Sequence, residues 1–142
     1  MDKQALREHF EQALEKAEPE FGQFFLARFY DLTIEYEKDC CRVRLPVAAH
    51  THNPIGILHG GVLATALDVS MGHLIHHVTG KGGSTVEMKI QYMRPISEGT
   101  VVCETQFLKQ GRRLSFMESR ATNEDGKLIA VATATWAMPA TD

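Results

Sequence analysis

Residues 60–77 read GGVLATALDVSMGHLIHH, and this stretch decides the fold. Its apolar side chains fall on nearly every face of a helix, and no proline interrupts them. A helix that is apolar all round is a buried helix, here roughly 25 Å long at about 1.5 Å per residue. It needs cover on most sides, and in a chain this small a strongly curved antiparallel sheet wrapped around it would supply that cover.

The segments on both sides of this helix are predicted to supply the strands. Before it, apolar and polar residues alternate over residues 29–37 and 41–46, which predicts a hairpin. After it, alternation and turn residues predict four strands, at 85–92, 101–109, 114–123 and 128–138. The predicted class is therefore α+β, with strands from before and after the long central helix sharing one curved sheet.

The N-terminal segment is predicted to be an amphipathic helix packed on the domain. Apolar residues recur at helical spacing over residues 3–16, Asp2 suits the N-cap, and Pro19 lies at or just past the end. The polar face is acidic, whereas a helix on a membrane surface is usually basic. We expect residues 1–142 to form a single domain, with residues 1–20 as its N-terminal helix.

Composition excludes several function classes. The net charge is −3, so the chain as a whole has no attraction for nucleic acid or for an anionic membrane. No apolar run approaches the length of a membrane span, and the N-terminus lacks the apolar core of a signal peptide. Three cysteines, two of them adjacent, do not form a disulfide framework. We therefore expect a cytoplasmic protein with neither nucleic-acid nor membrane partners.

The histidines do not predict a metal site. His50 and His52 lie two positions apart, and His73, His76 and His77 share one part of the predicted helix. Zinc sites usually add cysteine or carboxylate ligands at set spacing, and none is obvious here. We therefore expect no bound metal and no cofactor.

Two features of the buried helix carry chemistry. Gly60 and Gly61 stand at its start, where glycine lets another group approach the backbone closely, although it costs roughly 1 kcal/mol against alanine inside a helix. The first amides of a helix have no internal partner, so they can form an oxyanion hole. Asp68 is the one acid within the helix, and a carboxylate among apolar residues is costly unless it is paired. The alternatives are a simple tight turn for the glycines and a structural role for the acid.

Together these features suit attack on a carbonyl group. The acid would attack directly or activate water, and the amide would stabilise the oxyanion. Gly60 and Asp68 are eight positions apart, roughly 12 Å along one helix, whereas both must lie within about 3 Å of the reacting atoms. One helix cannot satisfy this, but two copies that meet at a two-fold axis can. We therefore predict a homodimer whose sites each combine Gly60 of one subunit with Asp68 of the other.

Residues 53–68, NPIGILHGGVLATALD, resemble the signature of hotdog-fold acyl-CoA thioesterases of the phenylacetate-pathway (PaaI) type. In that signature an Asn and a Gly precede His-Gly-Gly, and an acid follows eight residues into the helix. Residues 86–95, VEMKIQYMRP, resemble the family's strand after the helix, and residues 111–113 and 132–136 fit as well. The resemblance covers roughly residues 30–138. It implies a hotdog fold, an acyl-CoA substrate, and dimers that commonly pair into tetramers.

The resemblance also implies roles for residues of this chain. Asp68 would be the general base or the nucleophile, and Gly60 would donate the oxyanion-hole amide. Asn53 would position water or the thioester, and His59 would orient the helix start. Thr85 occupies the place of a Ser or Thr that the family often carries on the strand entering the site. A shorter acid holds a water more readily than it reaches the carbonyl carbon, so we favour Asp68 as general base.

Coenzyme A carries phosphates, and a chain with a net negative charge needs a local cluster of basic side chains to bind them. The first candidates are the arginines of the turn at residues 110–113. The full set of predicted substrate-binding residues is Gly61, Arg94, Lys109, Gly111, Arg112 and Arg113. The acyl group is left open between a medium or long fatty chain and an aryl acid. The candidate residues that line the acyl-binding tunnel on the helix are Met71, Leu74 and Ile75. Three phenylalanines before the first strand could cap this tunnel or merely pack in the core: Phe24, Phe25 and Phe29.

Other functions on the same fold stay open, because a fold does not fix a function. A non-catalytic acyl-CoA binding or sensor module would keep the basic cluster but lose the acid, so Asp68 argues against it. A dehydratase or hydratase would rely on a His and an acid placed for proton transfer, which His59 leaves open. A purely structural partner would need neither feature.

Overall fold

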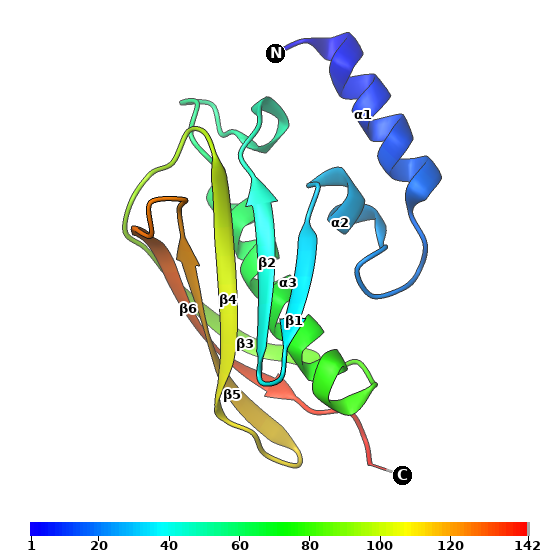
Figure 1. Cartoon of the computed structure of the whole chain (residues 1–142), viewed down its shortest axis with the longest axis vertical. Helices are drawn as coiled ribbons and strands as arrows, with labels where there is room; N and C mark the ends of the chain where they lie inside the picture. The colour runs from blue at the N-terminus through cyan, green and yellow to red at the C-terminus, as the bar shows by residue number, and fades with distance from the viewer. Residues whose placement is uncertain (142) are drawn as a thin grey trace.

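One antiparallel sheet of six strands wraps around a long helix in the computed structural model, which describes residues 1–141 (Figure 1). The helix is α3 (Gly60–Thr79), and the sheet order is β1-β2-β4-β5-β6-β3. Strands from before and after α3 share the sheet, so the predicted α+β hotdog fold is confirmed. The strand bounds are Thr33–Glu37 (β1), Cys40–Pro46 (β2), Ser84–Tyr92 (β3), Thr100–Lys109 (β4), Leu114–Thr122 (β5) and Leu128–Ala137 (β6).

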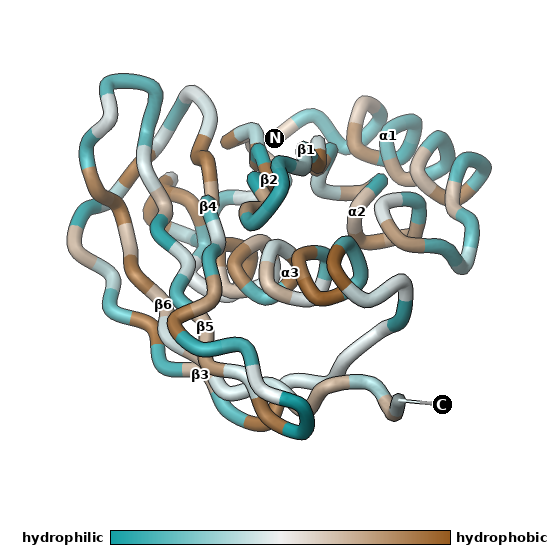
Figure 2. The backbone as a smooth tube through the Cα atoms, turned by 60° about the horizontal axis from the view of Figure 1, so that its bottom comes forward, coloured by the Kyte–Doolittle hydropathy of each residue, from teal (hydrophilic) through white to brown (hydrophobic). Residues whose placement is uncertain are grey.

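Helix α3 lies in the curve of the sheet because most of its faces are apolar. In Figure 2 its tube runs within the curve, and much of it has the brown of apolar residues. Its fully buried side chains include Leu67, Met71 and Leu74, which join the inward residues of the strands in one core. The helix ends at Gly80, whose φ of 71° is a left-handed conformation that glycine adopts without strain.

The N-terminal region contains two helices, of which the sequence predicted one. Helix α1 (Lys3–Lys16) has the predicted bounds, and the Asp2 side chain accepts hydrogen bonds from the first-turn amides. Residues 25–29 form the short helix α2 (Phe25–Phe29), so the prediction of a strand from residue 29 was wrong. The chain leaves α2 through Asp31, which has a φ of 51°, and β1 starts only at Thr33. Figure 1 shows α1 lying beside α2, away from the sheet.

Strand β3 is an edge strand with one unpaired side. It pairs with β6, and it is the last strand in the sheet order, so within residues 1–141 nothing pairs with its other side. Val86 and Tyr92 on this strand are 58% and 52% exposed. A long edge strand with exposed apolar residues is a ready template for pairing with another strand.

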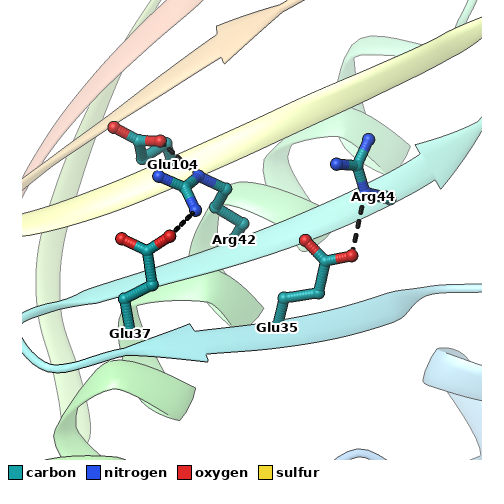
Figure 3. A network of polar contacts seen from close by, with 5 residues as sticks. All are labelled: Glu35, Glu37, Arg42, Arg44 and Glu104. Carbon is teal, nitrogen blue, oxygen red and sulfur yellow. Dashed lines mark hydrogen bonds and ion pairs between the residues drawn. The ribbon is translucent and has the colours of Figure 1, made fainter.

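The outward face of β1, β2 and β4 carries ion pairs rather than free cations. Arg42 contacts both Glu37 and Glu104, and Arg44 contacts Glu35 (Figure 3). Each such exposed pair contributes about 0–1 kcal/mol to stability. Both arginines already have carboxylate partners, so neither of the two is free for an anionic ligand.

Two further observations concern the helices and the cysteines. Among the residues that the structure describes, none of the helices is both long enough and apolar enough to span a bilayer. Cys40, Cys41 and Cys103 are all free and buried.

Candidate active site

The start of α3 presents one free backbone amide. His59 is the N-cap, and its Nδ1 accepts the Gly61 amide hydrogen at 2.9 Å. The next two amides both donate to the His59 carbonyl oxygen. Within residues 1–141 no acceptor takes the Gly60 amide. The first helical amide is therefore available for a ligand oxygen at the positive end of the helix dipole.

Tyr92 holds Gly60 in place from the end of β3. Its hydroxyl donates to the Gly60 carbonyl oxygen at 2.7 Å. Burial raises the pKa of Tyr92, so the hydroxyl keeps its hydrogen at neutral pH. A Cβ at Gly60 would lie 3.4 Å from the Tyr92 ring, which is close to ordinary van der Waals contact, so the two elements are packed directly against each other here. The sequence did not point to Tyr92, because periodicity assigns it to a strand but not to a partner on the helix.

A cleft of about 370 Å³ opens beside the Gly60 amide. Its lining includes Asn53, Tyr92 and Arg94. The Asn53 side-chain oxygen accepts the Ile55 and Ile57 amides at 3.1 and 3.3 Å, and so it shapes its own loop. The Asn53 side-chain nitrogen remains as a donor for water or substrate. The structure thus brings three of the predicted site residues, Asn53, Gly60 and Arg94, to one cleft.

Asp68 lies two turns further along α3 in a different cavity. Its Oδ1 accepts a hydrogen bond from the Thr85 hydroxyl of β3 at 2.7 Å, which brings the predicted pair together. The cavity holds about 530 Å³. Gly72 also lines it and lets α3 approach β6, because a Cβ there would lie 3.0 Å from the Trp136 ring.

Aromatic rings from the N-terminal segment form one wall of the Asp68 cavity. Phe21 and Phe24 both line it, and Phe21 stacks on His76 with ring centres 3.7 Å apart. Of the three phenylalanines named as possible caps, only Phe24 takes this position. Phe25 and Phe29 stack on each other and contact Phe10 of α1 instead.

His73 is a buried polar side chain on the same cavity. It is 3% exposed, and its Nδ1 lies 2.8 Å from the Val69 carbonyl oxygen, so Nδ1 carries the hydrogen. Its Nε2 has no partner within residues 1–141. Burial lowers the pKa of His73, so the ring is neutral and Nε2 is an acceptor. The sequence drew attention to this residue only as a possible metal ligand.

The two cavities share no lining residue, so one chain holds two separate halves of the predicted site. The Gly60 amide belongs to one half and the Asp68 carboxylate to the other. The helix residues named as acyl-lining candidates belong to neither cavity, because all three are fully buried in the core: Met71, Leu74 and Ile75.

The predicted phosphate contacts are also divided between the two ends of α3. Arg94 lines the Gly60 cleft, whereas Gly111 and Arg112 line a third cavity of about 350 Å³ that includes Thr79 at the helix C-terminus. Lys109 and Arg113 are exposed in the same turn region. Gly111 is required by packing, because a Cβ there would lie 2.1 Å from the Leu114 carbonyl oxygen.

Comparisons with known proteins point to one family. The family model of the thioesterase superfamily matches residues 55–130. Acyl-coenzyme A thioesterase 13 of Mus musculus is 40% identical over 97 residues, which cover 66% of this chain and 68% of the mouse protein. Proofreading thioesterase EntH of Cronobacter turicensis is 33% identical over 102 residues, which cover 68% of this chain and 74% of EntH.

The chain spans less than two thirds of some relatives, and one solved structure extends the likeness of fold. The chain spans 59% of the length of human acyl-coenzyme A thioesterase 13. A protein of Bacillus halodurans, solved with CoA, superposes with a TM-score of 0.80 over 94% of this chain and 88% of its own. The two are 22% identical, so this likeness bears on the fold alone.

Proposed function

This chain belongs to the thioesterase superfamily, and we propose that it hydrolyses acyl-CoA thioesters to a free acid and coenzyme A. The similar mouse and Cronobacter proteins are named as thioesterases, and the Bacillus neighbour was solved with CoA. The observation that carries the proposal is the free Gly60 amide on α3, the helix that also carries Asp68, whose Oδ1 accepts a hydrogen bond from Thr85 of β3. These groups are what attack on a thioester carbonyl requires.

We place each complete site between two copies of the chain. The Gly60 and Asp68 halves lie in separate cavities, and eight residues of helix separate them by roughly 12 Å. The unpaired edge of β3 runs beside both halves, since Thr85 bonds Asp68 and Tyr92 bonds Gly60. Antiparallel pairing of two β3 edges about a two-fold axis would set the two α3 helices side by side in opposite directions. The start of one helix would then face the middle of the other.

The reaction follows from these positions. The thioester carbonyl oxygen accepts the Gly60 amide hydrogen of one subunit, which stabilises the oxyanion as it forms. Asp68 of the other subunit takes a proton from a water, whose oxygen bonds to the carbonyl carbon. The carbon–sulfur bond then breaks, and the proton held by Asp68 passes to the departing CoA thiolate. We favour this general-base path over direct attack by Asp68.

Thr85, His59 and Asn53 position the reacting groups. Thr85 holds Asp68 Oδ1 and leaves Oδ2 for the water. His59 takes up the Gly61 amide, so that Gly60 alone offers a free hydrogen to the substrate. The Asn53 side-chain nitrogen can donate to the thioester or to the water in the same cleft as Gly60.

Phosphate binding falls to the basic residues that lack carboxylate partners within residues 1–141. Arg94 lies at the Gly60 cleft, and Lys109, Arg112 and Arg113 lie at the far end of α3. We propose that Arg94 is the main contact of the pantetheine–phosphate end of the ligand. Lys109, Arg112 and Arg113 would be contributed by another copy of the chain. From the resemblance to its family alone, we also propose that the homodimer pairs into a homotetramer, and from the composition we propose a cytoplasmic location.

The direct test is thiol release from a panel of acyl-CoAs, using wild type and Asp68→Asn. We expect turnover of some acyl groups by wild type, and a fall of about 10²–10⁴-fold in the folded Asp68→Asn protein, as for loss of a general base. Wild type that binds acyl-CoA without cleaving it would replace the proposal with a binding module. Wild type that neither binds nor cleaves any acyl-CoA would refute it.

A further inference from the structure

Three segments of the chain bring four possible metal ligands together, away from both halves of the thioesterase site. His9 comes from α1, the Phe29 carbonyl from the end of α2, Asp31 from the link to β1, and His50 from the short helix η1 (Ala49–Thr51). One ligand atom from each of the three side chains lies within 4.8 Å of the others. The sequence could not suggest this group, because His9 and His50 are far apart along the chain.

The distances within this His9–Asp31–His50 cluster match those around a metal ion. His9 Nε2 and His50 Nε2 lie 2.8 and 3.1 Å from the Phe29 carbonyl oxygen, and His9 Nε2 lies 3.6 Å from Asp31 Oδ2. Ligand atoms about 2.1 Å from one zinc ion are about 3.0 Å apart at a right angle and about 3.4 Å apart at the tetrahedral angle. Both Nε2 atoms point to the same carbonyl oxygen, and the two imidazole ring centres are 4.5 Å apart.

Within residues 1–141 no hydrogen bond reaches the Asp31 carboxylate of this cluster. Both histidine Nε2 atoms lie at hydrogen-bond distance from the Phe29 carbonyl oxygen, whereas Asp31 Oδ2 lies 3.6 Å from His9 Nε2, beyond a hydrogen bond. Asp31 is held in the left-handed region at a φ of 51°, a conformation that few non-glycine residues adopt. Such backbone conformations often persist where a site needs them.

We propose that His9, His50 and Asp31 bind one divalent transition metal ion of the zinc type, with the Phe29 carbonyl as a further ligand. Two imidazoles and a carboxylate are ligands that zinc prefers. The Asp31 and His9 side chains are 52% and 25% exposed, so the ion can enter from solvent and can also hold water. The metal would fasten α1 to the body of the domain at η1 and at the end of α2.

The test uses the full chain without an affinity tag, freed of metal with a chelator. Titration with Zn²⁺ alone, followed by calorimetry, should give one ion per chain and raise Tm, because the ion binds the folded state. Replacing Asp31 with Asn removes the carboxylate but keeps a residue that tolerates the left-handed backbone. We expect Asp31→Asn and His9→Gln each to weaken Zn²⁺ binding by at least about tenfold.

The matched control is His77→Gln, which removes an exposed histidine that stacks on Tyr36, outside the cluster. It should bind Zn²⁺ as wild type does. The proposal would be overturned if wild type takes up no Zn²⁺. It would also be overturned if Asp31→Asn, His9→Gln and the control His77→Gln all weaken Zn²⁺ binding to the same extent, or if none of them weakens it. If His9→Gln does not fold, Asp31→Asn at its exposed position decides the result.

Discussion

Replacing Thr85 with Val isolates the hydrogen bond to Asp68, the proposed catalytic carboxylate. Valine has nearly the shape of threonine, so the change removes the hydroxyl that donates to Asp68 Oδ1 at 2.7 Å and little else. Thr85 is exposed on an edge strand, and valine is favoured in strands. The free energy of unfolding should therefore change by less than about 0.5 kcal/mol.

The effect on catalysis should be larger than the effect on stability. A hydrogen bond to a charged group is worth about 1.5–3 kcal/mol when it is buried. This one is open to solvent in the single chain, so we take about 1–1.5 kcal/mol. Since about 1.4 kcal/mol is a factor of ten in rate, kcat/KM should fall roughly 5- to 12-fold.

The assay is kcat/KM for thiol release on the best substrate of the acyl-CoA panel, with urea unfolding measured on the same proteins. Thr85→Ser keeps the donor and should stay within about threefold of wild type. An unchanged kcat/KM in Thr85→Val would show that the hydrogen bond does not orient the acid. An equal loss in Thr85→Ser would show that the methyl group, rather than the hydroxyl, matters.

Three further predictions follow from contacts at the site and in the core. Tyr92→Phe removes the hydrogen bond to the Gly60 carbonyl, worth about 0.5–1.5 kcal/mol, so kcat should fall roughly 2- to 12-fold with KM little changed in steady-state kinetics. Leu74→Ala empties a fully buried position and should lower the free energy of unfolding by about 2–5 kcal/mol in urea titrations. Burial lowers the pKa of His73 and of His50 in the folded chain, so as the pH falls the unfolded chain binds protons at these histidines before the folded chain does. The free energy of unfolding should therefore decrease as the pH drops below 6.5. His73→Phe should make this decrease smaller, as measured by urea titrations at pH 5.5 and 7.5.

The fold could be predicted from the sequence because one helix dictates it. Residues 60–79 are apolar on most faces, and only a curved sheet could bury them in a chain of 142 residues. Residues 29–32 misled the prediction because their alternation resembles a strand, whereas packing of Phe25 and Phe29 against Phe10 favours the end of a helix. At residues 29–32 tertiary packing, rather than the local alternation of apolar and polar residues, determines the backbone conformation.

Less of the candidate site could be predicted, because it depends on register. Gly60, Asp68 and Asn53 belong to one stretch of chain, and helix geometry was enough to separate the first two. The contact of Tyr92 with Gly60 depends on how far β3 slides along β6 and α3, which a periodicity of two does not specify. The same holds for Phe21 and His73, which meet at the Asp68 cavity from elements far apart in the chain.

The central claim is that each site takes Gly60 from one subunit and Asp68 from the other. Gly60→Pro removes the amide hydrogen at the first helical position, where proline is favoured, and His59 before it is already extended (φ −65°, ψ 129°). Asp68→Asn removes the base. Each variant alone should be nearly inactive.

Mixing the two inactive variants is the most direct measurement. After equal mixing and subunit exchange, verified with two different tags, half of the dimers contain one subunit of each kind, and one of their two sites has both groups intact. Thiol release should then recover to about a quarter of the wild-type rate. If the exchanged mixture stays as inactive as its parents, Gly60 and Asp68 act within one chain or not at all, and the account is contradicted.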